Sequence, residues 1–344
     1  MKYYKQYLLL CLVFVACCSC RSFKSKSYPL AKKEQYLKRS CFGAKFEPKE
    51  TVLHGAGQDF NGFSDYRKAL GPTRTPKIYM TYIGIANPPQ VIYDWGWQLK
   101  NELDQLKIDG LIPQIGLTMI GGDPSTGALG DAGFAAGDRD ENIEAFCKAV
   151  KALDTPVFIR IGYEFETSGN NYKPETYIPA FIRIYKALQK HGIDFASIWC
   201  ITATYGPRVP WDRLMQYYPG DEYVDWWGVD IFSIEHIFSD RVLMFCDEAA
   251  QHNKPVMIGE STPRYVGTLQ GKTSWDGWFI PYFKLIRRTP NIKAFCYINW
   301  EWGYWSDKLG FGWHAWGDCR IEKNDYVTQM YKKEMNLPLY QHSP

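Results

Sequence analysis

Short apolar runs alternate with amphipathic stretches along most of the chain from residue 50 onward. The apolar runs are rich in β-branched and aromatic residues, which predicts strands that are buried on both faces. Strands are predicted at 51–54, 77–84, 111–119, 156–166, 195–203, 223–232, 254–260 and 292–300. In the stretches between them, apolar residues recur at helical spacing. Helices are predicted at 63–70, 94–107, 141–153, 174–191, 242–253 and 275–288, and a last helix at 326–335.

Eight strands that alternate with helices are typical of the (β/α)8 TIM barrel, an α/β fold. The predicted barrel domain covers residues 50–344. An open, doubly wound sheet is the alternative fold. Against it, no Gly-x-Gly-x-x-Gly follows a strand and no Gly-x-x-x-x-Gly-Lys-Ser/Thr occurs, so the phosphate cradles of nucleotide-binding folds are missing.

The composition is that of a chain with a large core. Of the 344 residues, 46% are hydrophobic and 16% aromatic, which excludes disorder for most of the chain. The net charge of +3 comes from 40 basic and 37 acidic residues, and this balance argues against nucleic acid as a partner. The 13 Trp and 24 Tyr residues suit a cleft that stacks sugar rings, although most of them are expected in the core.

The N-terminal segment has the features of an export signal. Residues 1–20 combine an early lysine, an apolar stretch and a group of small residues and cysteines, which predicts a signal peptide. The cysteine context resembles bacterial lipoprotein cleavage sites, so we expect a lipid on Cys17 or Cys20; a plain cleaved signal is the alternative. Residues 21–49 are predicted to be a flexible tether. The protein is therefore expected to be exported and anchored by lipid to a bacterial outer membrane, facing the periplasm or the cell surface.

The fourth predicted strand carries charge in an otherwise apolar run. Arg160 lies within it, and Glu164 and Glu166 follow at its end. Because side chains alternate along a strand, Arg160, Gly162 and Glu164 are expected on one face. A structural Arg–Glu pair is one interpretation, and a catalytic carboxyl at the carboxyl end of a barrel strand is the other.

A second carboxyl follows the seventh predicted strand, at Glu260. In a barrel both Glu164 and Glu260 would lie at the same rim. A retaining glycosidase needs two such groups, one protonated and one ionised, about 5–5.5 Å apart. Repulsion between the two would raise the pKa of one of them.

Three segments together resemble glycoside hydrolase family 26. They are Arg-Ile-Gly-Tyr-Glu-Phe at 160–165, Tyr-Tyr-Pro-Gly-Asp-Glu-Tyr-Val-Asp-Trp-Trp-Gly-Val-Asp at 217–230, and Lys-Pro-Val-Met-Ile-Gly-Glu at 254–260. The resemblance implies a retaining glycosidase in which Glu164 is the general acid/base and Glu260 the nucleophile. It also implies that Arg160 orients these acids. Trp227, in the second segment, is a candidate substrate contact.

Three positions depart from the family pattern. Tyr163 stands where the family usually has His, and Glu166 where it usually has Asn. Both are candidate substrate ligands, since either side chain can hydrogen-bond a sugar hydroxyl; Glu166 is also an alternative to Glu164 as the acid. Phe232 replaces a Tyr that is often present after the sixth strand. These changes leave retaining hydrolysis in place and open the question of which glycan is cut.

Other candidates follow the eighth and first strands. In the enzymes that the chain resembles, a Trp at the eighth strand's end floors a sugar subsite, which implies this role for Trp300, with Trp302 extending the cleft. His54 and Gln58 are candidate ligands after strand one, although a structural role for His54 is the alternative. The Asp-rich loop at 121–138 is predicted to be a solvated loop and not a Ca²⁺ site, because the spacing of its aspartates is not that of an EF-hand. No metal and no cofactor are predicted.

These observations predict a retaining, endo-acting glycoside hydrolase of β-linked polysaccharide, with β-mannan as the expected substrate. A β-1,3/1,4-glucanase or a xylanase would use the same machinery, because loop contacts set specificity. A surface glycan-binding protein on a barrel without turnover is the alternative from a different class.

Overall fold

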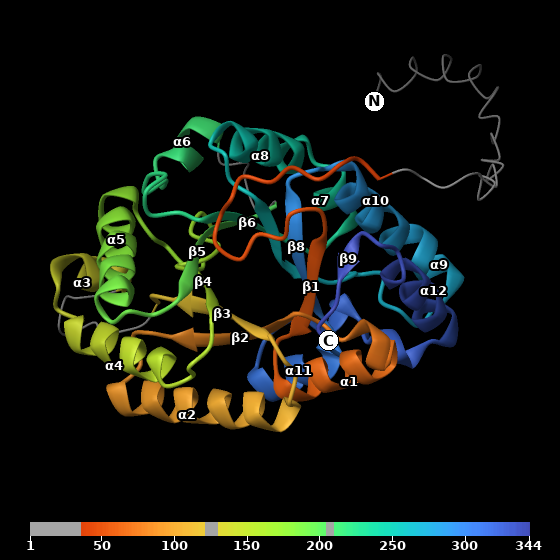
Figure 1. Cartoon of the computed structure of the whole chain (residues 1–344), viewed down its shortest axis with the longest axis horizontal. Helices are drawn as coiled ribbons and strands as arrows, with labels where there is room; N and C mark the ends of the chain where they lie inside the picture. The colour runs from red at the N-terminus through yellow and green to blue at the C-terminus, as the bar shows by residue number, and fades with distance from the viewer. Residues whose placement is uncertain (1–35, 121–129, 204–209) are drawn as a thin grey trace, which may run out of the picture. The chain divides into compact units, whose positions relative to one another are not determined.

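The computed structural model describes residues 36–120, 130–203 and 210–344. Its central feature is a closed barrel of eight parallel strands (Figure 1). Neighbours in the chain are neighbours in the sheet, and β1 pairs with both β8 and β2, which closes the ring. The strands are β1 Val52–Gly57, β2 Ile78–Gly84, β3 Ile112–Thr118, β4 Val157–Ile161, β5 Phe195–Thr202, β6 Trp226–Ile231, β7 Val256–Ser261 and β8 Ile292–Ile298. The predicted (β/α)8 barrel is confirmed.

Helices surround the barrel, as Figure 1 shows. They are α1 Phe60–Leu70, α2 Pro89–Leu106, α3 Gly130–Ala136, α4 Asp140–Lys151, α5 Pro174–Lys190, α6 Trp211–Met215, α7 Ile234–Ile237, α8 Asp240–Gln251, α9 Lys272–Ser274, α10 Ile280–Arg288, α11 Trp302–Leu309 and α12 Asp325–Met335. Each long helix lies close to its predicted range. The short helices α3, α6, α7, α9 and α11 were not predicted. α3 lies inside the stretch predicted to be a loop, because a helix of seven residues, about two turns, leaves little periodicity to read.

The segment before β1 belongs to the barrel. Arg39 is buried and donates hydrogen bonds to the backbone carbonyls of Ile286 and Thr289, at 2.8 and 3.0 Å. Phe46 packs edge-on against Phe158 of β4, with 5.5 Å between ring centroids. The tether prediction is therefore wrong from residue 36 onward, since a flexible tether would not make these fixed contacts with the barrel and α10. The predicted signal peptide at 1–20, with its Cys17 and Cys20, and the tether residues 21–35 lie outside the described residues.

The buried side chains form two layers, one inside the barrel and one between the barrel and its helices. Both layers are apolar because each strand is covered on both faces, so the strands show no alternation of apolar and polar residues. Trp226 and Trp227 on β6 show the division. Trp226 points into the barrel against Phe158, whereas Trp227 packs outward against Phe245 of α8.

The C-terminal segment ends in a short strand, β9 (Tyr340–Gln341), which pairs in parallel with the start of β1. All eight barrel strands point the same way, so their carboxyl ends form one rim. Among the residues that the structure describes, no helix has the length and apolar character needed to span a bilayer.

Candidate active site at the carboxyl rim

A buried arginine joins two carboxylates from different strands. Arg160 of β4 is fully buried, and its Nη1 donates to Oδ2 of Asp230 on β6 at 2.7 Å. Its Nη2 donates to Oε1 of Glu260 on β7 at 2.5 Å. Such short, charge-assisted contacts fix the orientation of the Glu260 carboxylate. The structure therefore brings together Arg160 and Glu260, two of the predicted site residues.

Two glycines make room for this network. A Cβ on Gly259 would lie 2.7 Å from Oδ1 of Asp230 and 3.0 Å from Cδ of Arg160. A Cβ on Gly116 of β3 would lie 2.5 Å from the ring of Tyr82 and 3.2 Å from Nη2 of Arg160. Larger side chains at either position would displace the guanidinium from its carboxylates.

Aromatic rings cover the guanidinium on the rim side. The centroid of the Tyr163 ring lies 4.5 Å from Cζ of Arg160, and that of Tyr82 lies 5.6 Å away. The two rings meet edge to face, with centroids 5.8 Å apart. Both side chains are half-buried and shield the Arg160 charge from water. The Tyr82 hydroxyl contacts Sδ of Met80, inside the barrel, at 3.2 Å. Tyr163 thus contacts Arg160, and its role as a substrate ligand stays a prediction.

Glu164 lies in a turn after β4. The strand ends at Ile161, and Gly162 and Glu164 have φ angles of +59° and +50°. The predicted alternation therefore fails beyond Ile161, because left-handed backbone breaks the strand period. The turn is held by Asn170, whose side-chain amide donates to the carbonyls of Tyr163 and Glu164 at 2.9 Å each. A left-handed conformation costs a residue other than glycine about 1 kcal/mol or more, so these contacts hold Glu164 in a strained geometry.

The electrostatic environment of Glu164 is that of a proton donor. Burial raises the pKa of its carboxyl well above the usual range, and the negative charges of Asp230 and Glu260 raise that pKa further. Burial also raises the pKa of Asp230, to about 8, while Arg160 opposes this increase. Glu164 thus has a raised pKa, whereas the Glu260 carboxylate is paired with a guanidinium. This is the division of roles expected of an acid and a nucleophile.

Glu166 points to the end of β5. Its Oε1 accepts a hydrogen bond from the backbone N–H of Thr202 at 2.7 Å, and its Oε2 is buried without a hydrogen-bond partner in the described part of the chain. Burial raises its pKa to about 8. One oxygen of this carboxyl is thus committed to the backbone and the other is enclosed by protein, so the role of Glu166 as a substrate ligand stays a prediction. Gln58, after β1, likewise has a buried Oε1 that no described residue hydrogen-bonds, and its φ is +92°.

The tryptophans after β8 enclose one another. Trp300 is 6% exposed, and Nε1 of Trp300 donates to Asp59. Trp305 stacks on the Trp300 indole, with ring centroids 4.3 Å apart. Trp302 is 2% exposed. Sugar stacking needs an open indole face, so Trp300 and Trp302 offer little surface for the predicted role. Trp305 is only partly buried and leaves more of its indole accessible.

Two predicted ligands lie elsewhere, which corrects the prediction for both. His54 is fully buried outside the barrel interior, where its ring nitrogens contact the hydroxyl of Tyr66 at 3.3 Å and Nδ1 of His342 at 2.9 Å. Trp227 is fully buried against Trp199, with centroids 4.8 Å apart. Both residues are structural, because the strand face that carries them points to the helices and away from the rim.

The acidic loop before α4 forms ordinary structural contacts where it is described. Asp131 accepts hydrogen bonds from the Thr176 hydroxyl at 2.7 Å and from the backbone N–H of Lys173 at 3.2 Å. Asp140 pairs with Arg183. Asp123 lies outside the described residues, and within residues 36–120, 130–203 and 210–344 no three metal-ligating side chains come together.

Sequence reasoning missed two residues of this site, Asp230 and Tyr82. Asp230 is a charged residue near the end of an apolar strand, as Arg160 is within another. A buried charge needs a partner, so the two could have been paired from the sequence. That signal was present in the sequence, within the second of the three segments. Tyr82 carries no such signal, since a tyrosine in a strand is ordinary.

Comparisons with known proteins agree on the family. Residues 142–269, which include Glu164, Asp230 and Glu260, match the sequence model of Glycosyl hydrolase family 26. A Beta-1,3-xylanase from Alcaligenes sp is 30% identical over 319 residues, covering 86% of this chain and 66% of that protein. Beta-1,3-xylanase TXYA from Vibrio sp is 29% identical over 322 residues, covering 86% of this chain and 67% of that protein. The chain thus spans about two thirds of the length of these relatives.

Solved structures share the fold at low sequence identity. An endo-beta-1,4-mannanase double mutant from Cellulomonas fimi aligns with a TM-score of 0.61 and 14% identity, over 85% of this chain and 72% of that one. GH26C from Muricauda sp. MAR_2010_75 aligns with a TM-score of 0.60 and 12% identity, over 85% and 87%. By the family match over the segment that holds Arg160, Glu164 and Glu260, and by the barrel that it shares with these structures, the chain is glycosyl hydrolase family 26-like.

Proposed function

We propose that the protein hydrolyses a β-linked xylan, specifically β-1,3-xylan, with retention of anomeric configuration. The observation that carries the reaction type is the Arg160 bridge to Asp230 and Glu260 beside a carboxyl, Glu164, whose pKa is raised. The substrate comes from the two relatives near 30% identity, both named β-1,3-xylanases. The mannanase structures, at far lower identity, support the barrel alone, so β-mannan becomes the comparison substrate.

The proposed reaction has two steps. Protonated Glu164 donates its proton to the glycosidic oxygen while Glu260 attacks the anomeric carbon, so that the glycosidic bond breaks and a glycosyl ester forms on Glu260. Glu164, now ionised, then takes a proton from water, whose oxygen attacks the same carbon and releases Glu260. Arg160 holds one oxygen of Glu260 in place, and Asp230 holds Arg160. The product keeps the β configuration.

The test is hydrolysis of β-1,3-xylan, β-1,4-xylan, β-mannan and mixed-linkage β-glucan by the full chain, by Glu164→Gln and by Glu260→Gln. Glu141→Gln, an exposed glutamate in the first turn of α4, is the matched control. We expect release of reducing ends from β-1,3-xylan, a loss of at least about a hundredfold in both site variants, and no loss in the control. Faster hydrolysis of β-mannan would replace the substrate and keep the mechanism.

The alternative, a glycan-binding protein without turnover, has its own outcome. It requires that none of the four glycans is cut, and that wild type, Glu164→Gln and Glu260→Gln bind one of them equally well. That result would refute the proposed enzyme.

We also propose that residues 1–20 direct export and that a lipid is attached at Cys17 or Cys20. Mass spectrometry of the mature N-terminal peptide identifies the acylated cysteine. An N-terminus without lipid in the mature protein would instead support the plain cleaved signal.

A further inference from the structure

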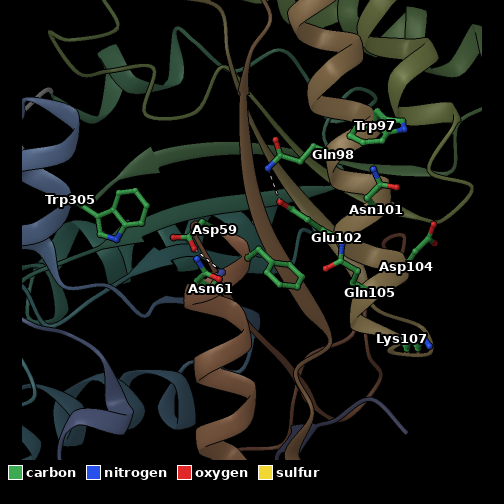
Figure 2. A pocket seen from close by; sticks show the side chains of 11 residues that line it. Asp59, Asn61, Trp97, Gln98, Asn101, Glu102, Asp104, Gln105, Lys107 and Trp305 are labelled. Carbon is green, nitrogen blue, oxygen red and sulfur yellow. Dashed lines mark hydrogen bonds between the residues drawn. The ribbon is translucent and has the colours of Figure 1, made fainter.

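A groove of about 900 Å³ lies on the outer wall of the barrel, beside the rim. Its lining comes from the first turn of α1, from the outer face of α2 and from α11. Figure 2 shows Trp305 on one side and the α2 side chains on the other, with Asp59 and Asn61 between them. The lining residues are Asp59, Phe60, Asn61, Trp97, Gln98, Asn101, Glu102, Asp104, Gln105, Lys107 and Trp305.

The most informative side chain in the groove is Trp97. It is 73% exposed, the most exposed of the large hydrophobic residues among those described. The opposite face of α2 carries the buried residues, so Trp97 adds nothing to the core. Large exposed indoles are uncommon unless they serve as contact surfaces, and an indole face suits the apolar C–H face of a sugar ring.

The polar lining suits sugar hydroxyls. Gln98, Asn101, Gln105 and Asn61 supply primary amides, each of which both donates and accepts hydrogen bonds. Part of this lining is already ordered, since Gln98 donates to Oε1 of Glu102 at 2.8 Å.

The charge of the groove selects among glycans. Three carboxylates (Asp59, Glu102, Asp104) and one ammonium (Lys107) line the groove, and Lys100 pairs with Asp104 at 3.8 Å. Glu102 also accepts from the Tyr79 hydroxyl at 2.8 Å, which holds this carboxylate in the lining. Lys308 also lies 4.7 Å from the Trp305 ring, so charges of both signs balance at the groove. An anionic polyuronate or sulfated polysaccharide would meet no excess of cations here, so the fitting ligand is a neutral chain.

The groove adjoins the rim through two contacts. Trp305, which lines the groove, stacks on Trp300, and Asp59, also in the lining, accepts from Nε1 of Trp300. A polysaccharide on the groove would therefore lie next to the segment that follows β8. Trp97 itself has no part in the Arg160 network.

We propose that this groove is a second binding site for neutral polysaccharide, which holds the substrate chain on the outer wall while the rim carries out hydrolysis. The proposal of a substrate chain rests on the proposed function; the chemistry of the groove, with its indoles, amides and carboxylates, stands apart from it. A site of this kind raises the local concentration of polymer at the rim and has no effect on short substrates.

The test compares Trp97→Ala with Phe238→Ala, which removes an aromatic side chain of similar exposure (70%) from the end of α7. Affinity electrophoresis of the full chain, in a Glu260→Gln background that blocks turnover, measures retardation by β-1,3-xylan, β-mannan, mixed-linkage β-glucan and alginate. We expect Trp97→Ala to weaken binding of a neutral glycan by about three- to tenfold, Phe238→Ala to leave it unchanged, and alginate to retard none of the proteins.

Kinetics with Glu260 intact complete the test. Trp97→Ala should raise KM on polymeric substrate and leave kcat/KM on a β-1,3-linked xylotriose unchanged. If every neutral glycan retards Trp97→Ala as much as the Glu260→Gln parent, the proposed binding site in the groove is refuted. An absence of hydrolysis in all proteins would refute the proposed function, whereas retardation that depends on Trp97 would still support the groove.

Discussion

Replacing Arg160 with methionine tests whether this side chain holds the site together. Arg160 is fully buried and bridges Asp230 and Glu260 at 2.7 and 2.5 Å. Removal of one partner from a buried ion pair costs about 3–5 kcal/mol, because it leaves uncompensated charge. Here two carboxylates lose their shared cation. At about 2.1 cal/mol/K of unfolding entropy per residue, a barrel of about 300 residues loses about 1.5 °C in Tm per kcal/mol, so Arg160→Met should lower Tm by roughly 5–8 °C.

The sign of the effect depends on the partners, which makes the test sharper. In an Asp230→Asn, Glu260→Gln background, Arg160 is a buried cation that faces two neutral amides. Its replacement by methionine there should be neutral or stabilising, because a buried charge without a counter-charge is costly. Arg183→Met, which breaks an exposed pair with Asp140, is the control and should cost less than about 1 kcal/mol.

Urea unfolding followed by tryptophan fluorescence measures these free energies. The prediction is refuted if Arg160→Met alone costs less than about 1 kcal/mol. It is also refuted if adding Arg160→Met to the Asp230→Asn, Glu260→Gln variant costs as much stability as adding it to the wild type. In either case the contacts of Arg160 would not be what keeps Asp230 and Glu260 in place.

Three further experiments probe the same site. Gly259→Ala places a Cβ 2.7 Å from Asp230, so we expect a loss of about 1–3 kcal/mol in unfolding free energy and reduced kcat; a variant of wild-type stability and rate would contradict the close packing. Asn170→Ala frees the carbonyls of the turn at Glu164, and should lower kcat more than it raises KM in steady-state assays, with unchanged kinetics arguing against a strained turn. Because burial and the neighbouring carboxylates raise the pKa of Glu164, its protonated form should persist to higher pH than that of an ordinary glutamate, and kcat/KM should fall on the alkaline side as pH rises through that pKa. This alkaline limb should vanish in Glu164→Ala, assayed on an aryl xyloside that needs no acid, and persist in Glu166→Gln; the reverse pattern would make Glu166 the acid.

The fold was predictable because eight apolar runs alternate with amphipathic stretches. The position of each side chain within a strand was not. Trp226 and Trp227 are neighbours in the same strand, yet one fills the barrel and the other packs against α8. In a strand that is buried on both faces, both positions are apolar, so the pattern does not tell inward from outward. The prediction of His54 as a ligand failed for the same reason.

The site was predictable where a charge interrupts an apolar strand. Arg160 and Glu260 gave that signal, and the structure pairs them. The end of β4 was not predictable from the apolar pattern, because Phe165 continues the apolar run of the sequence. In the structure Phe165 lies after the strand and stacks on Trp199, with 4.9 Å between ring centroids. The left-handed backbone at Gly162 ends the strand, and only the glycine marked it.

The predicted tether failed at residue 36 for a similar reason. Its basic, serine-containing composition is typical of a linker, and composition does not show that Phe46 packs against Phe158 of the barrel. Long-range packing of this kind leaves no local periodicity.

The most direct test of the central proposal is to trap the glycosyl-enzyme. A 2-deoxy-2-fluoro-xyloside with a good leaving group, incubated with the full chain, should leave a covalent sugar on the peptide that contains Glu260, as seen by mass spectrometry after proteolysis. Hydrolysis of β-1,3-xylan followed by proton NMR should then show the β-anomer as the first product. A label on another carboxyl, or the α-anomer as the first product, would contradict the assignment of Glu260 as the nucleophile of a retaining enzyme.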